Sequence, residues 1–229
     1  MLILIKIFLS EKEVVKMKKR KFLLFLLFAF LSFSVFSSNL KLVKMVCKKR
    51  KEMEKRLHAY IRIVDTKFLT YNMKGKLLDQ KEEHSELYWD GKIWMEKGED
   101  KNKADKNTED KIIYPFKTEN QQFFNYNISE KKDTYLIRVS LKKEFGKMGA
   151  ETGEYIISKK TGYFKERNSF LTKMSSPLLK SHRIKKVYKE IAPKVIAPIK
   201  RKDTIETKSF LGFGKRIIII TTYKYRKKK

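Results

Sequence analysis

The spacing of apolar residues changes once along the chain, near Ala59. Before this point, apolar side chains recur every three or four positions over residues 39–58, which predicts an amphipathic helix. After it, apolar and polar residues alternate with a period of two in short runs, which predicts β-strands. The residues expected on the apolar face of the helix are Leu40, Val43, Val46, Cys47, Met53 and Leu57.

Hairpin signals connect the predicted strands. Asp90-Gly91 separates two alternating runs and predicts a two-residue hairpin loop. The run 194–201 continues past Pro198 and is expected at a sheet edge, because proline cannot donate to a β-ladder. Residues 97–111 are polar and predict a mobile loop. The predicted strands cover 60–65, 85–89, 92–96, 112–116, 122–128, 134–141, 154–158, 163–170, 183–191, 194–201, 204–210 and 215–225.

The order of these elements sets the fold class. No strand–helix–strand alternation is present, which argues against a parallel sheet. We therefore predict a mainly β (α+β) fold. Its core is a curled antiparallel sheet that forms an incomplete barrel, and one N-terminal amphipathic helix packs against it.

The segment after Met17 has the pattern of an export signal. Four basic residues are followed by the largely apolar stretch 22–36, which is shorter than the roughly 20 residues of a membrane span. We expect cleavage after Ser37 or Ser38 and a periplasmic location. The alternative is an uncleaved N-terminal membrane anchor.

Three segments follow from this signal. Residues 1–16 are expected to be an untranslated leader, because codons for Lys12-Glu13-Val14 can form a ribosome-binding sequence just before Met17. Residues 17–37 are the signal peptide. Residues 38–229 form a single β-rich domain, large enough for its own core.

The chain is strongly basic, with a net charge of +29. Such a charge is typical of contact with nucleic acid or with an anionic surface. The excess comes mostly from lysine, whereas base readout relies on the arginine fork. Nucleic acid is therefore not the expected partner. A solvated basic surface and contact with an anionic membrane both remain open, and we expect a monomer.

Catalytic patterns are missing from the sequence. The three histidines are scattered, and one cysteine allows neither an internal disulfide nor a zinc site built on cysteine pairs. Gly212-x-Gly214 lacks the third glycine and the helix of a dinucleotide-binding loop. We expect no catalytic residue, no metal and no cofactor, and a protein that is not an enzyme.

Aromatic and aliphatic residues on the predicted strands indicate a binding surface instead. Alternate residues of a strand share one face, so Leu87 lies with Trp89, Ile93 lies with Met95, and Tyr135 lies with Ile137 and Val139. A face of this kind either packs as core or lines an apolar cavity. One helix is little cover for so many strands, so these seven residues are the candidate lipid-binding set.

The order of signal peptide, helix and antiparallel strands resembles the periplasmic lipoprotein-carrier superfamily (LolA-like, with outer-membrane lipoprotein-sorting relatives). The similar segments are 87–94 (LYWDGKIW), 153–165 (GEYIISKKTGYFK) and 188–200. The resemblance implies an incomplete barrel that shelters lipid or lipoprotein acyl chains without covalent chemistry. It also implies a functional arginine, for which Arg62 on the first strand is the candidate.

Two features depart from that family. Its lid helices have no counterpart in 97–111, which is too polar, or in 171–182, which contains Pro177. The alternative to a carrier is an exported, non-catalytic interaction module whose basic surface docks on an anionic membrane or envelope polymer.

Overall fold

The computed structural model describes residues 39–91, 94–96, 112–146, 148–173, 178–208 and 214–228. The chain divides into two compact units, Met1–Leu42 and Val43–Lys229, and the second is described below. The predicted leader, the signal peptide, Ile93 and the whole polar loop 97–111 lie outside the described residues.

The predicted helix spans residues 39–57. Five of its predicted apolar residues are buried, at a spacing that places them on one face: Val43, Val46, Cys47, Met53 and Leu57. Leu40, by contrast, is 40% exposed. Basic and acidic residues fill the other face and pair along it, as Lys49 with Glu52 and Arg50 with Glu54.

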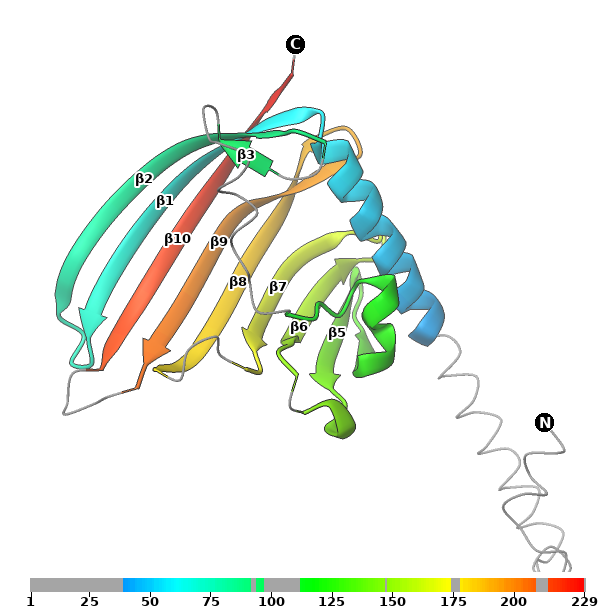
Figure 1. The fold of residues 1–229 in the computed structure, drawn as a ribbon. Coiled ribbons are helices and arrows are strands. Elements are labelled where there is room, and N and C mark those ends of the chain that lie inside the picture. The colour runs from blue at the N-terminus through cyan, green and yellow to red at the C-terminus, as the bar shows by residue number, and fades with distance from the viewer. Residues whose placement is uncertain are drawn as a thin grey trace, which may run out of the picture. The chain divides into compact units, whose positions relative to one another are not determined.

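The described strands form one antiparallel sheet (Figure 1). Its ten strands are β1 Tyr60–Asn72, β2 Leu77–Trp89, β3 Trp94–Glu96, β4 Phe124–Glu130, β5 Thr134–Leu141, β6 Glu151–Ser158, β7 Phe164–Leu171, β8 Leu179–Ala192, β9 Val195–Thr207 and β10 Lys215–Lys227. Two short 3-10 helices, η1 Thr118–Phe123 and η2 Lys143–Phe145, flank β4 and β5.

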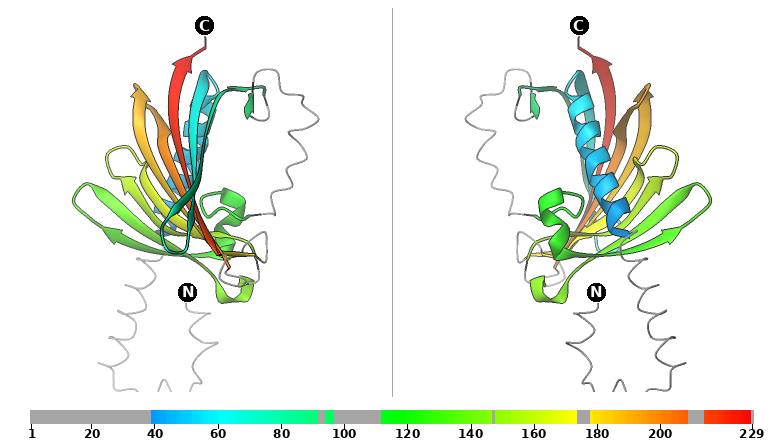
Figure 2. Two further views of the ribbon diagram at one scale, coloured as in Figure 1. Left: turned by 90° about the vertical axis from the view of Figure 1, so that its left-hand side faces the viewer. Right: turned by 90° about the vertical axis from the view of Figure 1, so that its right-hand side faces the viewer.

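The strand order across the sheet is β3-β2-β1-β10-β9-β8-β7-β6-β5-β4. Strands β4 to β10 follow one another as a meander, and β10 then pairs with β1 along its full length, from Tyr60 opposite Lys227 to Asn72 opposite Lys215. The sheet is curled, and its edge strands β3 and β4 do not pair with each other (Figures 1 and 2). This confirms the predicted fold class.

The concave face packs at two places. Toward one end of the sheet, Phe116 contacts Tyr155 and Phe164, and Tyr155 lies opposite the buried Ile137. At the C-terminal end of the helix, Met53 and Leu57 form a cluster with Tyr163, Ile196 and Ala197. Strands β2, β1 and β10 extend beyond the helix (Figure 1).

Several local predictions were wrong. Residues 112–116, predicted as a strand, form only an isolated bridge at Ile113 followed by a turn. The runs predicted at 194–201 and 204–210 fall, over their described residues, largely on one strand, β9.

Strand β2 begins at Leu77 rather than at residue 85, because residues 77–84 are exposed and give no buried face to detect. Trp89 pairs with Trp94, so four residues rather than Asp90-Gly91 alone separate the paired positions. Strand β9 is central rather than at an edge. It tolerates Pro198 because the register shifts beside its partner Tyr188.

Candidate functional site

The candidate lipid-binding residues do not come together. Leu87 and Trp89 lie on β2 and Met95 on β3, whereas Tyr135, Ile137 and Val139 lie on β5. The strand order places these two groups near opposite edges of the sheet. Alternation identified residues that share a face within a strand, but it carries no information on which strands become neighbours.

Packing occupies most of these six residues. Ile137 is fully buried opposite Tyr155, and Val139 is buried opposite Gly153. Trp89 stacks on His58 with ring centroids 3.8 Å apart and meets Trp94 edge-on at 5.9 Å. Met95 is buried on the face opposite to Leu87 and Trp89, because it pairs with Tyr88.

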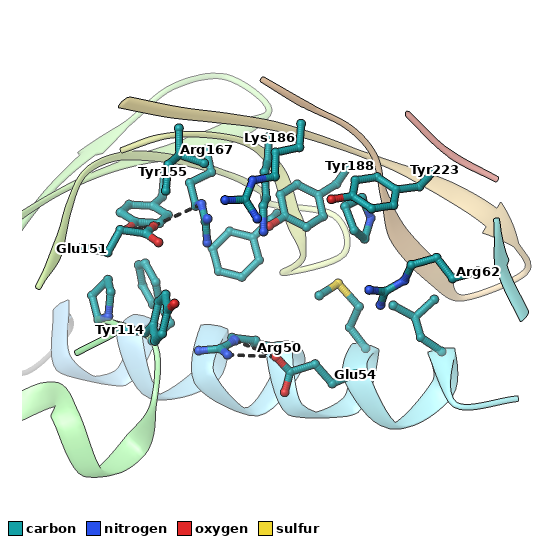
Figure 3. Close-up of a pocket in the computed structure, with 18 residues that line it drawn as sticks. Arg50, Glu54, Arg62, Tyr114, Glu151, Tyr155, Arg167, Lys186, Tyr188 and Tyr223 are labelled. Atoms are coloured by element: carbon teal, nitrogen blue, oxygen red, sulfur yellow. Dashed lines mark hydrogen bonds and ion pairs between the residues drawn. The ribbon is translucent and has the colours of Figure 1, made fainter. Parts of the chain in front are cut away.

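A cavity of about 290 Å³ lies elsewhere, between the helix and the middle of the concave face (Figure 3). Helix residues form one wall, inward-facing strand residues form the other, and Tyr114, Pro115 and Phe116 lie at one end. Its volume is close to the lower end of the roughly 300–1,000 Å³ of small-molecule pockets. The apolar part of the lining consists of Met53, Leu57, Pro115, Phe116, Phe164, Ile184 and Pro198.

Three cationic side chains enter the cavity from adjacent strands. Arg167 on β7 is directly opposite Lys186 on β8, and Lys186 is directly opposite Arg201 on β9. We call these three residues the cationic row. Like charges directly opposite one another destabilise a sheet, so the row depends on negative charge nearby.

Two buried carboxylates supply part of that charge. Asp203 accepts hydrogen bonds from Arg201 Nε at 2.5 Å and Nη2 at 2.7 Å, and its Oδ1 lies 2.8 Å from His182 Nε2. Burial opposes the ionisation of Asp203, but the hydrogen bonds from His182 and Arg201 outweigh it and keep its pKa below the usual value.

Glu151 plays the same part for Arg167. Its Oε1 lies 3.1 Å from Arg167 Nε and accepts a 2.8 Å hydrogen bond from the Tyr155 hydroxyl. The Arg167 Nε–H is not directed at this oxygen, so this nitrogen has no hydrogen-bond partner among the described residues. The contact is an ion pair by distance, and one buried donor remains available.

Lys186 differs from its two neighbours. Within the described part of the chain, its ammonium group has no hydrogen-bond or ion-pair partner. Burial, followed by the charges of Arg167 and Arg201, lowers the pKa of Lys186 to about 7. This lysine therefore changes its charge near neutral pH.

Arg62, the candidate arginine from the first strand, also lines the cavity. Its guanidinium lies over the Trp94 ring, 4.0 Å from the centroid, and 5.8 Å from the Tyr223 centroid. Its buried Nε has no hydrogen-bond partner among the described residues. No carboxylate of the described residues forms an ion pair with it.

The helix contributes one neutral pair and an apolar wall. Arg50 Nη2 lies 2.9 Å from Glu54 Oε1 across one turn, so these two charges offset each other (Figure 3). Met53 and Leu57 lie on the buried face of the same helix. The cavity thus combines an apolar wall with a net excess of positive charge on the sheet.

Among the described residues, no group of three or more histidine, cysteine or acidic residues could hold a metal ion. Burial raises the pKa of the Cys47 thiol, which receives a hydrogen bond from Gln121 and is kept in its unreactive protonated form. Fixed guanidinium groups and buried N–H donors beside apolar surface suit an anionic group attached to an apolar one.

The sequence contains a signal for the cationic row that is not a motif. Lys186 stands between Ile184 and Tyr188 in the inward-facing series of β8, and Arg201 shares a face with Asp203 on β9. A charged residue in the same alternating series as apolar residues is expected on the inward face of the sheet. Tyr188 on β8 and Tyr223 on β10 also line the cavity and likewise place a polar group on the inward face of a strand.

Within the described residues, no helix has the length and apolar character needed to cross a membrane. Comparisons of the chain with protein-family models, with curated proteins and with solved structures gave no significant match.

Proposed function

We propose that this protein is an exported, non-catalytic binding protein for lipid or lipoprotein acyl chains, which lie on the concave face of the sheet. The cavity between the helix and this face is the observation that carries the proposal. Its apolar wall suits methylene groups, whose burial contributes about 0.8 kcal/mol for each CH₂.

The cavity leads toward further apolar surface on the same face. Tyr223 lines the cavity, and Ile219 and Ile217 follow on the same side of β10. Their partners on β1 are Phe68 and Thr70. Phe68, Ile217 and Ile219 are only half-buried, and this strip of β1 and β10 is where an acyl chain would continue.

The small volume of the cavity decides how such a ligand would lie. At about 290 Å³, it suits the polar end of an amphiphile and the first part of its chain. The rest of the chain would lie along the strip of Phe68, Ile217 and Ile219. This arrangement also gives the cations of the cavity a role, because they would face the polar end.

Native mass spectrometry and displacement of a fluorescent fatty-acid probe test this proposal. We expect bound lipid to accompany the purified chain, and unlabelled fatty acid to displace the probe. A chain that carries no lipid and does not bind the probe would exclude the function.

A second candidate function rests on the convex face. Five exposed basic residues alternate with the cavity-lining residues of β8 and β9 and therefore point away from the cavity: Arg183, Lys185, Lys189, Lys200 and Lys202. Lys185 is paired with Glu166. Such a surface suits an anionic membrane, to which each lysine contributes about 1 kcal/mol. Vesicle binding that falls with salt, without extraction of lipid, would favour this function.

A further inference from the structure

We propose that the cavity binds the phosphate monoester head group of an amphiphile at the cationic row, with Arg62 adding positive charge to the same cavity. The inference rests on the proposed lipid-binding function and names the polar chemistry of its ligand. It is carried by the register of three strands, by two unpaired cations and by buried donors without acceptors.

The charges that line the cavity favour a dianionic head group. Arg201 is paired with Asp203, Arg167 with Glu151, and Arg50 with Glu54. Lys186 and Arg62 are the cavity-lining cations without a carboxylate partner among the described residues. A phosphate monoester carries a charge between −1.5 and −2 at neutral pH. Its charge therefore balances both cations, whereas the single charge of a carboxylate would balance only one of them.

Two buried N–H donors that line the cavity lack an acceptor among the described residues. They are Arg62 Nε and Arg167 Nε. A buried donor without a partner costs free energy, and such sites in proteins are commonly completed by a ligand, an ion or water. A phosphate group offers three acceptor oxygens, so it can accept a hydrogen bond from the buried nitrogen of Arg167 and another from its strand neighbour Lys186.

The apolar groups that line the cavity favour a phosphate ester over a free phosphate ion. Phe164 and Ile184 line the same cavity as the row, and Met53 and Leu57 lie on the facing helix wall (Figure 3). Inorganic phosphate would leave this wall without a partner. An alkyl phosphate would contact the cations with its head and the wall with its chain.

Isothermal titration calorimetry at pH 7 with the full chain tests the assignment. The probes are decyl phosphate, decanol and inorganic phosphate, each below any micelle concentration. We expect decyl phosphate to bind at least tenfold more tightly than either of the others, because charged hydrogen bonds and chain burial act together.

The test variant is Lys186→Met, and Lys189→Met on the convex face of the same strand is its control. We expect Lys186→Met to weaken decyl phosphate binding about tenfold or more, with decanol binding unchanged. Lys189→Met should leave both affinities as they are. Thermal unfolding of both variants establishes that they fold, and methionine retains the aliphatic volume at position 186.

Each contrary result has a distinct meaning. Equal affinities for decyl phosphate and decanol, both insensitive to Lys186→Met, would overturn the phosphate assignment while lipid binding stands. Inorganic phosphate that binds as tightly as decyl phosphate would overturn the amphiphile assignment. If none of the probes binds, the proposed function itself is wrong.

Discussion

Two parts of the concave face show the same alternation of inward and outward residues, but one is packed and the other borders a cavity. On β5, the inward residues Ile137 and Val139 are buried and do not line the cavity. On β7 to β9, the inward residues include Arg167, Lys186 and Arg201, and a cavity remains beneath the helix. The same period of two therefore produces a closed core in one part and a polar site in the other.

The difference shows what determines a binding site on a curled sheet. Strand alternation decides which side chains face inward, but the segment lying above them decides whether space remains. Phe116 packs on Tyr155 of β6, with ring centroids 4.8 Å apart, and borders the cavity there. Over the cationic row, an apolar cover would cost free energy, because it would remove Lys186 from water without a carboxylate partner among the described residues.

The largest expected effect compares two buried isoleucines. Ile137→Ala should lower the free energy of unfolding by an amount well within the range of about 2–5 kcal/mol for such truncations, because its surroundings are fully packed. Ile184→Ala should cost less, toward the lower limit, because Ile184 already borders the cavity. Urea unfolding measures both. A larger loss for Ile184→Ala would contradict the contrast between packed and hollow regions.

The next effect concerns the pH dependence of stability. In the unfolded chain Lys186 keeps its proton up to a pKa near 10.5, whereas in the folded chain its pKa is about 7. Between these values the unfolded state binds more protons, so rising pH stabilises the fold, by at most about 1.4 kcal/mol per pH unit from this group. The charged groups that face Lys186 are Arg167, Glu151, Arg201, Asp203 and, from the helix, Arg50 and Glu54.

Urea unfolding at pH 7.5 and pH 9.0 measures this effect. Stability should rise with pH more steeply in the wild-type chain than in Lys186→Met, while Lys189→Met should follow the wild type. Equal slopes in all three proteins would mean that folding does not lower the pKa of Lys186.

A smaller effect is expected on the acyl-chain strip. Ile218 and Ile219 are neighbours on β10 with similar exposure, but they point to opposite faces. Ile219→Ser removes apolar surface from the strip and should weaken fatty-acid binding several-fold. Ile218→Ser is the matched control and should leave affinity unchanged, as read by displacement of a fluorescent probe. Equal weakening by both would place the chain elsewhere.

The smallest effect concerns the convex face. Replacing Lys200 and Lys202 by glutamine should lower binding to anionic vesicles by a few-fold at low salt, and less at high salt, because exposed charges are screened. Lipid binding in the cavity should not change. If lipid binding fell as well, the two faces would not act independently.

Much of the fold could be predicted from the sequence, because half-buried elements show their period. Val43, Val46 and Leu57 identified the helix face, and the alternation around Ile137 identified a strand. Residues 77–84 were missed because both faces of that stretch are exposed. The pairing of β10 with β1 joins residues far apart in sequence, and local periodicity does not report such pairing.

The site was harder to predict for the same reason. Trp89 and Ile137 both face a packed neighbour, yet they lie near opposite edges of the sheet. The cationic row exists only through the register of three strands, which brings Arg167, Lys186 and Arg201 side by side. Without knowledge of that register, these three residues cannot be distinguished from the many other lysines and arginines of the sequence.

Photolabelling locates the ligand most directly. A fatty acid carrying a diazirine group in its chain would be bound to the full chain, irradiated, and the labelled peptides mapped by mass spectrometry. We expect labels on inward-facing positions of β1 and β10, around Phe68 and Ile219, and at the cavity residues of β8. Labels confined to β4 and β5, or spread over the convex face, would contradict binding between the helix and the concave face.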